Sequence, residues 1–435
     1  MPSMRSMIPL TLASLLALTG ARAALPEAVA PPATVETLRA LNQDTRFQAA
    51  RAKLDADWDR LVQDVITLTE IPAPPFGEEN RARAFADMLR AHGLEDVEID
   101  AEGNAMGLRR GTGAPGGPLL VVAAHLDTVF PASTDVKVRR EGDRLFAPGI
   151  GDDTCSLAVL LAFIRAMDEA GIRTKSDILF VGNVGEEGPG DLRGMRYLFG
   201  QGKYKDRIAQ FISFEPNREA VAIGGIGSKR YKVTFKGPGG HSRGDFGIVN
   251  PAYALADAIT LFDKMPAPRE SGTVYNVGIL EGGTSVNSIP FAVSMTVDMR
   301  SQSKADLDAE EQYFLSILQP AADAENARHS TGKGTISFET TKIGDRPVGM
   351  TPPDARIAQV AVASMRAAGV TPQFRWGSTD SNIPMSLGIP AVTLGSGFST
   401  SRGHSLEESL LLDRAGTVKH MAIGLATVIT LANGD

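Results

Sequence analysis

Short runs of mostly apolar residues alternate along the chain with longer stretches in which apolar residues recur at helical spacing. The short runs, at residues 119–124, 178–181 and 211–214, each lead into polar residues or glycine. Such runs are typical of strands that are buried on both faces of a sheet. Helical spacing predicts helices at residues 37–69 and 80–92. Strands that alternate with helices in this way indicate an α/β fold.

The pattern changes near Gly227, where the strands begin to alternate polar and apolar residues. From residue 228 to 343 the expected order is strand, helix, strand, strand, helix, strand. The strands are expected at 231–237, 273–280, 292–300 and 335–343, and the helices at 250–265 and 304–318. Two strand–helix units of this kind suit an α/β sandwich with one open face. We therefore expect a second domain at 228–343, inserted between two parts of the first domain at 24–227 and 344–435.

The amino end has the pattern of a signal peptide. Arg5 supplies a positive charge, residues 8–18 form an apolar run too short to span a bilayer, and residues 21–23 read Ala-Arg-Ala. We expect cleavage after residue 23 and a mature protein that is periplasmic or secreted, without stable membrane association. An uncleaved anchor is the alternative. Cys155 is the single cysteine, so an internal disulfide is excluded.

Composition excludes several classes of protein. With 435 residues, 43% hydrophobic and 22% charged, the chain has the composition of a soluble globular protein with two domains. A formal net charge of −7 gives no reason to expect a nucleic-acid partner. The glycine-rich stretch at 237–242, GPGGHS, lacks the ending of a phosphate-binding loop. Residues 240–244 spell Gly-x-Ser-x-Gly, but they follow an alternating strand rather than a buried strand that leads straight into a helix. The chain therefore lacks the nucleophile elbow, which disfavours a serine hydrolase.

Two adjacent carboxylates, Glu186 and Glu187, follow the apolar run at 178–181. An acidic pair usually lies on a solvated surface, but this pair follows a buried strand, and open α/β sheets bind ligands at the carboxyl ends of their strands. Glycines on both sides would let a ligand approach the backbone closely. One carboxylate could therefore bind a metal ion while its neighbour transfers protons.

Further metal-binding side chains follow the neighbouring strands. His125 and Asp127 come after the run at 119–124 and can project together, because residues i and i+2 of an extended chain share a face. The Asp127 carboxylate could accept the second ring N–H of His125 and fix its tautomer. Asp152 precedes a helix, where it could cap the helix, bind metal, or do both. Glu215 ends a third strand, so three strand ends present candidate ligands.

Together the motifs HLD, GDD, GEEG, FEP and GHS resemble the di-zinc exopeptidase and deacylase family of glutamate carboxypeptidase, succinyl-diaminopimelate desuccinylase, acetylornithine deacetylase and aminoacylase. The resemblance covers nearly the whole chain after the predicted signal peptide. It implies a zinc-exopeptidase catalytic domain of the α/β class, interrupted by a ferredoxin-like α/β sandwich that serves as a dimerisation or lid domain. It also implies two zinc ions per subunit and a homodimer.

The resemblance assigns a role to each motif residue. His125 and Glu215 would hold one zinc ion, Glu187 and His404 would hold the other, and Asp152 would bridge the two. Asp127 would orient His125, and Glu186 would be the general base.

The inserted domain would contribute three residues that act on the substrate, namely His241, Asn287 and Arg300. His241 would reach the metal site of the partner subunit or, in a monomer, its own site by domain closure. The chain departs from many relatives at 153–155, Asp-Thr-Cys, which are not ligand positions in the family. Cys155 is expected to be a packed small residue rather than a nucleophile.

We therefore expect a zinc-dependent hydrolase that cleaves an amide bond of a small peptide or N-acyl amino acid, of the carboxypeptidase or deacylase type. Two zinc ions would lower the pKa of a shared water toward about 7, and Glu186 would take its proton. An aminopeptidase or dipeptidase of the same family is the alternative. A non-catalytic periplasmic protein that binds peptides or metal is an alternative of another class.

Overall fold

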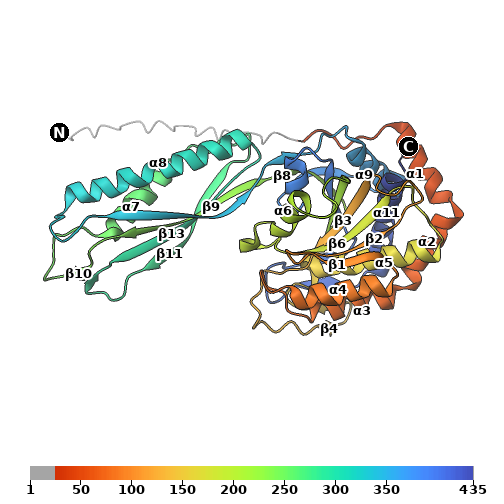
Figure 1. The fold of residues 1–435 in the computed structure, drawn as a ribbon, viewed down its shortest axis with the longest axis horizontal. Coiled ribbons are helices and arrows are strands. Elements are labelled where there is room, and N and C mark those ends of the chain that lie inside the picture. The colour runs from red at the N-terminus through yellow and green to blue at the C-terminus, as the bar shows by residue number, and fades with distance from the viewer. Residues whose placement is uncertain (1–24, 435) are drawn as a thin grey trace, which may run out of the picture.

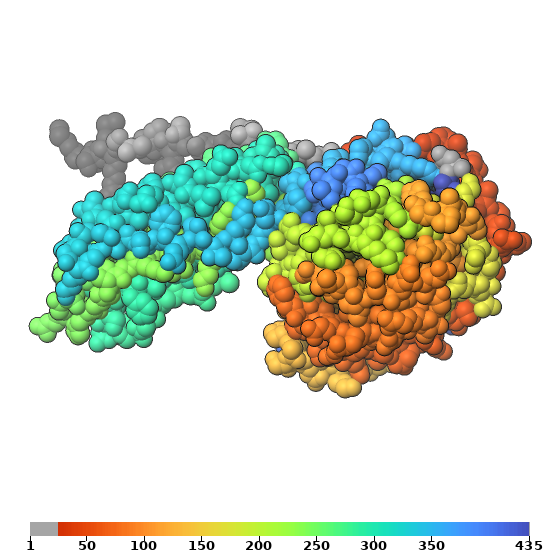
Figure 2. Space-filling model, in the orientation of Figure 1, coloured from red at the N-terminus to blue at the C-terminus, as the bar shows by residue number. Residues whose placement is uncertain are grey.

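The computed structural model describes residues 25–434, so the predicted signal peptide lies outside the described residues. The chain forms two lobes that lie side by side along the longest axis (Figure 1). The larger lobe contains a nine-stranded sheet and most of the helices, and the smaller lobe contains a four-stranded sheet. Figure 2 shows that the inserted segment forms the smaller lobe and that the parts of the chain before and after it form the larger one.

The nine-stranded sheet has the order β1-β2-β6-β3-β7-β17-β8-β15, with β16 paired to β8. Its strands are β1 Glu95–Ile99, β2 Ala105–Arg109, β3 Leu119–His125, β6 Asp177–Asn183, β7 Ile208–Glu215, β8 Ala220–Gly225, β15 Gly349–Met350, β16 Gln373–Gly377 and β17 Ala391–Gly395. The central strands β6, β3, β7 and β17 run parallel to one another. Their carboxyl ends therefore meet at one edge of the sheet.

Both faces of the central strands are buried, as the apolar runs predicted. On one face Leu120, Val122 and Ala124 of β3 pack under the larger group of helices. These are α1 Pro32–Gln43, α2 Thr45–Ala56, α3 Trp58–Thr69, α4 Glu79–Ala91, α5 Ser156–Glu169, α9 Arg356–Ala367 and α11 Arg414–Asn433. On the opposite face Val121 and Ala123 pack with α6 Arg193–Gly200 and α10 Asn382–Ser386.

The single helical stretch expected at residues 37–69 is wrong. The segment forms three helices, α1, α2 and α3, which pack around the edge of the larger lobe (Figure 1). The break between α1 and α2 lies at Asp44, which has extended backbone and whose carboxylate accepts the backbone N–H groups of Arg46 and Phe47. A carboxylate at this position caps the start of a new helix. The apolar residues keep their helical spacing on both sides of the cap, so the spacing alone does not reveal the turn.

The inserted domain has the predicted order of strands and helices. Its sheet has the order β11-β13-β9-β14, with every neighbouring pair antiparallel, and α7 and α8 cover one face. The elements are β9 Gly227–Lys236, α7 Pro251–Phe262, β11 Val274–Gly282, β13 Ala292–Ser301, α8 Lys304–Arg328 and β14 Ser337–Arg346. This is the ferredoxin-like topology. The domain has a hydrophobic core of its own, separate from that of the larger lobe.

Smaller elements complete the fold. One four-stranded sheet, β18-β19-β5-β4, lies on the larger lobe, and a two-stranded pair, β10 with β12, lies on the smaller one. Their bounds are β4 Arg139–Glu141, β5 Arg144–Phe146, β10 Gly240–His241, β12 Ser288–Ile289, β18 Ser399–Ser401 and β19 Ser409–Leu411. Among the described residues one helix, α11, is long and apolar enough to cross a membrane, but 67% of its apolar window is buried against the rest of the protein.

Candidate metal centre

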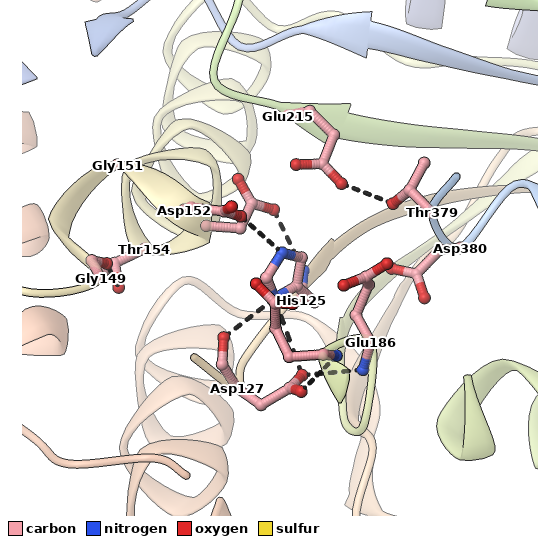
Figure 3. A network of polar contacts seen from close by, with 12 residues as sticks. His125, Asp127, Gly149, Gly151, Asp152, Thr154, Glu186, Glu215, Thr379 and Asp380 are labelled. Carbon is pink, nitrogen blue, oxygen red and sulfur yellow. Dashed lines mark hydrogen bonds and ion pairs between the residues drawn. The ribbon is translucent and has the colours of Figure 1, made fainter. Parts of the chain in front are cut away.

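The parallel strands bring the predicted ligands together at one edge of the sheet. His125 is the last residue of β3, Glu215 is the last residue of β7, and the Glu186–Glu187 pair follows β6 (Figure 3). Gly185 makes the turn before the pair, with φ of +71°, a conformation that glycine adopts at no steric cost. The strand ends therefore place imidazole and carboxylate groups around one point.

Asp152 lies between the two predicted histidine ligands. One oxygen, Oδ1, is 3.0 Å from Nε2 of His125, and the other, Oδ2, is 3.1 Å from Nε2 of His404. His404 Nε2 is also 3.0 Å from Oε1 of Glu187. His404 comes from the loop between β18 and β19 and has φ of +62°, a strained conformation often found at functional sites.

The carboxylate of Asp127 has a different role from the expected one. The nearest acceptor for Nδ1 of His125 is the backbone carbonyl of Asp127, at 3.0 Å, whereas the carboxylate is 3.7 Å away. The carboxylate instead accepts the backbone N–H groups of Glu186, at 3.0 Å, and Glu187, at 2.7 Å (Figure 3). Asp127 thus fixes His125 through its backbone and the acidic pair through its side chain.

Glu186 is held by Arg346, a residue that the sequence did not single out. Arg346 Nη1 donates to Oε1 of Glu186 at 2.9 Å, and Nη2 donates to the Glu186 backbone carbonyl. The guanidinium also donates to the carbonyl of Ser378. Arg346 is only 5% exposed. A planar guanidinium fork of this kind fixes both the position and the orientation of a carboxylate.

A second missed residue, Glu408, holds the loop that presents Asp152. Its carboxylate accepts the backbone N–H groups of Gly149, Gly151 and Asp152, at 2.8, 2.9 and 2.8 Å, and it is fully buried. Glu408 follows His404 by a few residues, so the same loop supplies a predicted ligand and supports another one.

Asp153 lies closer to the cluster than its place outside the family's ligand set suggested. One carboxylate oxygen accepts the backbone N–H of His125, and the other has no hydrogen-bond partner among the described residues. Ligand atoms of His125, Asp153 and Glu215 all lie within 4.8 Å of one another. Thr379 donates to Glu215 Oε1 at 2.6 Å and so orients that carboxylate (Figure 3).

Burial and neighbouring charges shift the pKa values of the carboxyl groups in the cluster. Burial, followed by the charge of Glu186, raises the pKa of Glu187 to about 7. Burial likewise raises the pKa of Glu215 and that of Asp153 well above their ordinary values. Burial also favours the neutral form of Asp152, but hydrogen bonds from His125 and His404 outweigh it and lower the Asp152 pKa. Buried carboxylates next to imidazoles are the donor set that zinc uses, so these residues fit a metal centre.

A cavity of about 560 Å³ opens over the cluster, between the two domains. Arg300 lines it, as expected for a substrate-binding residue. His241 and Asn287 do not line it: both are exposed near the β10–β12 pair, where His241 lies opposite Ser288. One chain alone therefore brings together the predicted metal ligands, Asp127, Glu186 and Arg300, but not His241 and Asn287.

Cys155 is buried at the start of α5, within hydrogen-bonding distance of the Gly151 carbonyl and Ser396. Burial raises its thiol pKa well above the ordinary value. A buried, protonated thiol is unreactive, which agrees with the expected packing role.

The fold and the cluster together define the class of this protein: a two-domain α/β protein with a ferredoxin-like insertion and a buried histidine–carboxylate cluster that could hold metal. Residues 121–432 match the peptidase family M20/M25/M40. The chain therefore belongs to this family, and the predicted resemblance is confirmed.

Similar curated proteins include both carboxypeptidases and deacylases. The chain is 26% identical to carboxypeptidase G2 of Pseudomonas sp. (strain RS-16) over 45% of this chain and 47% of that protein. It is also 26% identical to a putative succinyl-diaminopimelate desuccinylase of Mycobacterium tuberculosis over 76% of this chain and 88% of that protein. The matches to the first three such relatives span 47%, 64% and 34% of their lengths.

Solved structures share the fold over most of the chain. A tripeptidase from Staphylococcus aureus is 20% identical with a TM-score of 0.69, covering 86% of this chain and 98% of that one. Human carnosine dipeptidase 1 is 13% identical with a TM-score of 0.67, covering 89% and 99%. These similarities establish the two-domain fold.

Proposed function

We propose that the protein is a zinc-dependent hydrolase that cleaves an amide bond in a small peptide or N-acyl amino acid. The observation that carries this proposal is the position of Glu186, which lies beside the ligand cluster yet pairs with Arg346 rather than with a ligand. A protein that only binds metal needs the ligands, but it does not need an additional carboxylate that binds no metal. Family membership supports the same conclusion.

The residues divide into ligands and groups that act on the substrate. His125 and Glu215 would hold one zinc ion, Glu187 and His404 the other, and Asp152 both. Bound zinc would polarise the scissile carbonyl and make water more acidic. Glu186 would accept a proton from the attacking water and later deliver it to the leaving amine. Asp127 and Arg346 would keep Glu186 at the required position, as their hydrogen bonds indicate.

We place His241 and Asn287 in the active site of a partner subunit. Both are exposed and distant from the cavity of their own chain, and His241 would donate a hydrogen bond to the developing oxyanion. The edge strand β11 supports a dimer, because it exposes Val274, Ile279 and Leu280, which are 50%, 52% and 60% exposed. An apolar edge strand is a ready template for pairing with a second copy.

Carboxypeptidase or deacylase specificity is the favoured form of the activity. The similar curated proteins are named as carboxypeptidases and a desuccinylase, and Arg300 lines the cavity where it could bind a substrate carboxylate. An aminopeptidase or dipeptidase is the second candidate, because solved structures of the same fold carry those names. Faster release from a peptide with a free amine and blocked carboxyl than from the reverse would favour the second candidate.

The predicted signal peptide supports a periplasmic or secreted location, and the buried position of α11 supports a protein without stable membrane association. Fractionation of the native host with an antibody, together with the mass of the mature amino terminus, tests both points. A full-length protein in the cytoplasm would contradict them.

The function itself is tested with purified protein. Metal content by mass spectrometry and hydrolysis of a panel of dipeptides, tripeptides and N-acyl amino acids, with and without a chelator, are the two measurements. We expect two equivalents of zinc and chelator-sensitive hydrolysis. Zinc binding without hydrolysis of any member would favour the non-catalytic binding protein.

A further inference from the structure

The cavity above the metal centre is lined by four arginines, Arg230, Arg300, Arg346 and Arg375. Three of the four have carboxylate partners, in unequal ways. Arg346 is paired with Glu186. Arg230 and Arg300 share one carboxylate, that of Asp298, through their Nε atoms at 2.9 and 2.6 Å.

Arg375 has the fewest counter-charges. It is exposed, and the only hydrogen bond that its side chain makes among residues 25–434 is from Nη2 to the neutral Gln373 side chain at 2.8 Å. Among the described residues, the four guanidinium groups therefore pair with only two carboxylates, Glu186 and Asp298. The remaining acids at the cavity are the cluster that fits the metal ions.

The sheet places Arg375 within reach of a bound substrate. Arg375 on β16 lies opposite Ala222 on β8, which lies opposite Thr393 on β17, the neighbour of β7. Neighbouring strands are about 4.8 Å apart, so the Arg375 backbone is roughly 14 Å from the strand that ends in Glu215. Thr393 and Ala222 also line the cavity and are small, so the floor between Glu215 and Arg375 is open.

Arg230 also lines the cavity. It extends from β9 of the inserted domain and donates from Nη1 to the carbonyl of Gly188, directly after Glu187, at 3.2 Å. Arginines thus line the cavity both beside the Glu187 turn and along the outer strand of the large sheet. A neutral substrate would leave Arg375 without a carboxylate partner, and Arg230 with one that it shares with Arg300.

We propose that Arg375, together with Arg230, forms an anion subsite, so that the preferred substrate carries a carboxylate in addition to the one that Arg300 would bind. This inference rests on the proposed hydrolase function and narrows its substrate class to amides with two acidic groups. The second carboxylate belongs either to the side chain of the released amino acid or to the acyl group. In either position the guanidinium groups would bind it by charge-assisted hydrogen bonds.

Two matched substrate pairs test the proposal on the zinc-loaded enzyme. N-acetyl-L-glutamate against N-acetyl-L-glutamine places the second carboxylate on the amino acid, and N-succinyl-L-leucine against its neutral succinamide counterpart places it on the acyl group. We expect kcat/KM to favour the charged member of one pair about ten-fold or more. The favoured pair identifies the position of the acid.

Arg375→Gln and Arg230→Gln should lower that ratio several-fold, chiefly through KM for the charged member, and added salt should lower it in the wild type. Arg39→Gln is the control, because it makes the same change of net charge on α1, where Glu36 is the one ion-pair partner of Arg39 in the described part of the chain. A ratio of one or less in both pairs, or a ratio that neither cavity variant changes, would overturn the anion subsite.

Hydrolysis of none of the four compounds would count against the proposed function instead. Calorimetry with glutarate then tests whether the anion subsite exists, independently of hydrolysis. Binding to the zinc-loaded protein that Arg375→Gln weakens and Arg39→Gln does not would support the subsite, and equal binding to all three proteins would overturn it.

Discussion

Glu186 and Glu187 are neighbours in sequence with separate environments, and a substitution can distinguish their roles. Glu186→Gln keeps the size of the side chain but removes the proton acceptor, so kcat should fall by about 10²–10⁴-fold. Zinc content, measured by mass spectrometry, should remain at the wild-type level because Glu186 is not a ligand in the proposed arrangement. Retention of kcat near the wild-type value would remove Glu186 from the role of base.

His404→Ala provides the matched contrast for the base. His404 Nε2 lies 3.1 Å from Asp152 and 3.0 Å from Glu187, so its loss should reduce zinc content and activity together. A His404→Ala protein with full zinc content would reassign the ligands.

The motif residues could be predicted because each candidate ligand lies within a few positions of the strand and the turn that present it. Arg346 could not be predicted, because it is 160 residues away from Glu186 in the sequence. Glu408 is equally hidden, since its partners are backbone N–H groups 256 to 259 residues earlier. Their contacts exist only after both parts of the larger lobe have folded together.

The loop of residues 149–152 depends on one carboxylate from another element. Glu408→Ala would leave three backbone N–H groups without this acceptor, two of them in buried hydrogen bonds, which should lower the free energy of unfolding by about 1–3 kcal/mol. Because the loop presents Asp152, zinc affinity should also fall about 10- to 100-fold. Denaturant unfolding and zinc titration measure the two effects. Glu407→Ala, at the exposed neighbouring position, should change neither.

Helix α8 carries a buried carboxyl group that should make stability depend on pH. Glu310 is 2% exposed, neither oxygen has a hydrogen-bond partner among the described residues, and burial raises its pKa from 4.5 to about 8. Between these values the folded protein keeps a proton that the unfolded chain releases, so this contribution to stability falls as pH rises from about 4.5 to 8.

Glu310→Gln should remove that contribution and flatten the dependence of Tm on pH across this range. Asp323→Asn is the control, because Asp323 is an exposed acid of the same helix. Thermal unfolding at pH 5, 6, 7 and 8 measures the effect. Equal slopes for wild type and Glu310→Gln would show that Glu310 is ionised in the folded state.

The sequence predicted the helices and strands correctly where burial gives the apolar residues a simple period. The prediction failed where a turn interrupts a helix without changing that period. The parallel strands and the inserted domain were predictable from apolar runs and alternation. The amino-terminal segment was not, because α1, α2 and α3 keep helical spacing while the chain turns at Asp44 and Asp57. Asp44 caps the next helix with its side chain, whereas Asp57 makes no such hydrogen bond. Aspartates are also common on helix surfaces, so neither residue marks a turn in the sequence alone.

At the scale of the whole molecule, the separation of His241 from its own cavity predicts complementation between subunits. His241→Ala and Glu186→Ala chains should each be inactive as homodimers. Mixed and allowed to exchange, they should regain up to about one quarter of wild-type activity per site at equal amounts, because half of the dimers are mixed and each mixed dimer has one site with both residues. The measurement is hydrolysis together with sizing by light scattering.

A monomer in solution would contradict this arrangement, as would mixed dimers that remain inactive. Two Glu186→Ala preparations mixed with each other provide the control, since every site then lacks the base.

The position of Arg346 in the fold also connects the proposed base, Glu186, to movement of the two lobes. It is the last residue of β14 and pairs with Ser228 of β9, and these two strands carry the chain into and out of the inserted domain. Two paired strands make a single hinge. Rotation of the smaller lobe about that hinge would shift the Arg346 guanidinium relative to Glu186. The ability of Glu186 to accept a proton would then depend on how far the lobes have closed over a substrate.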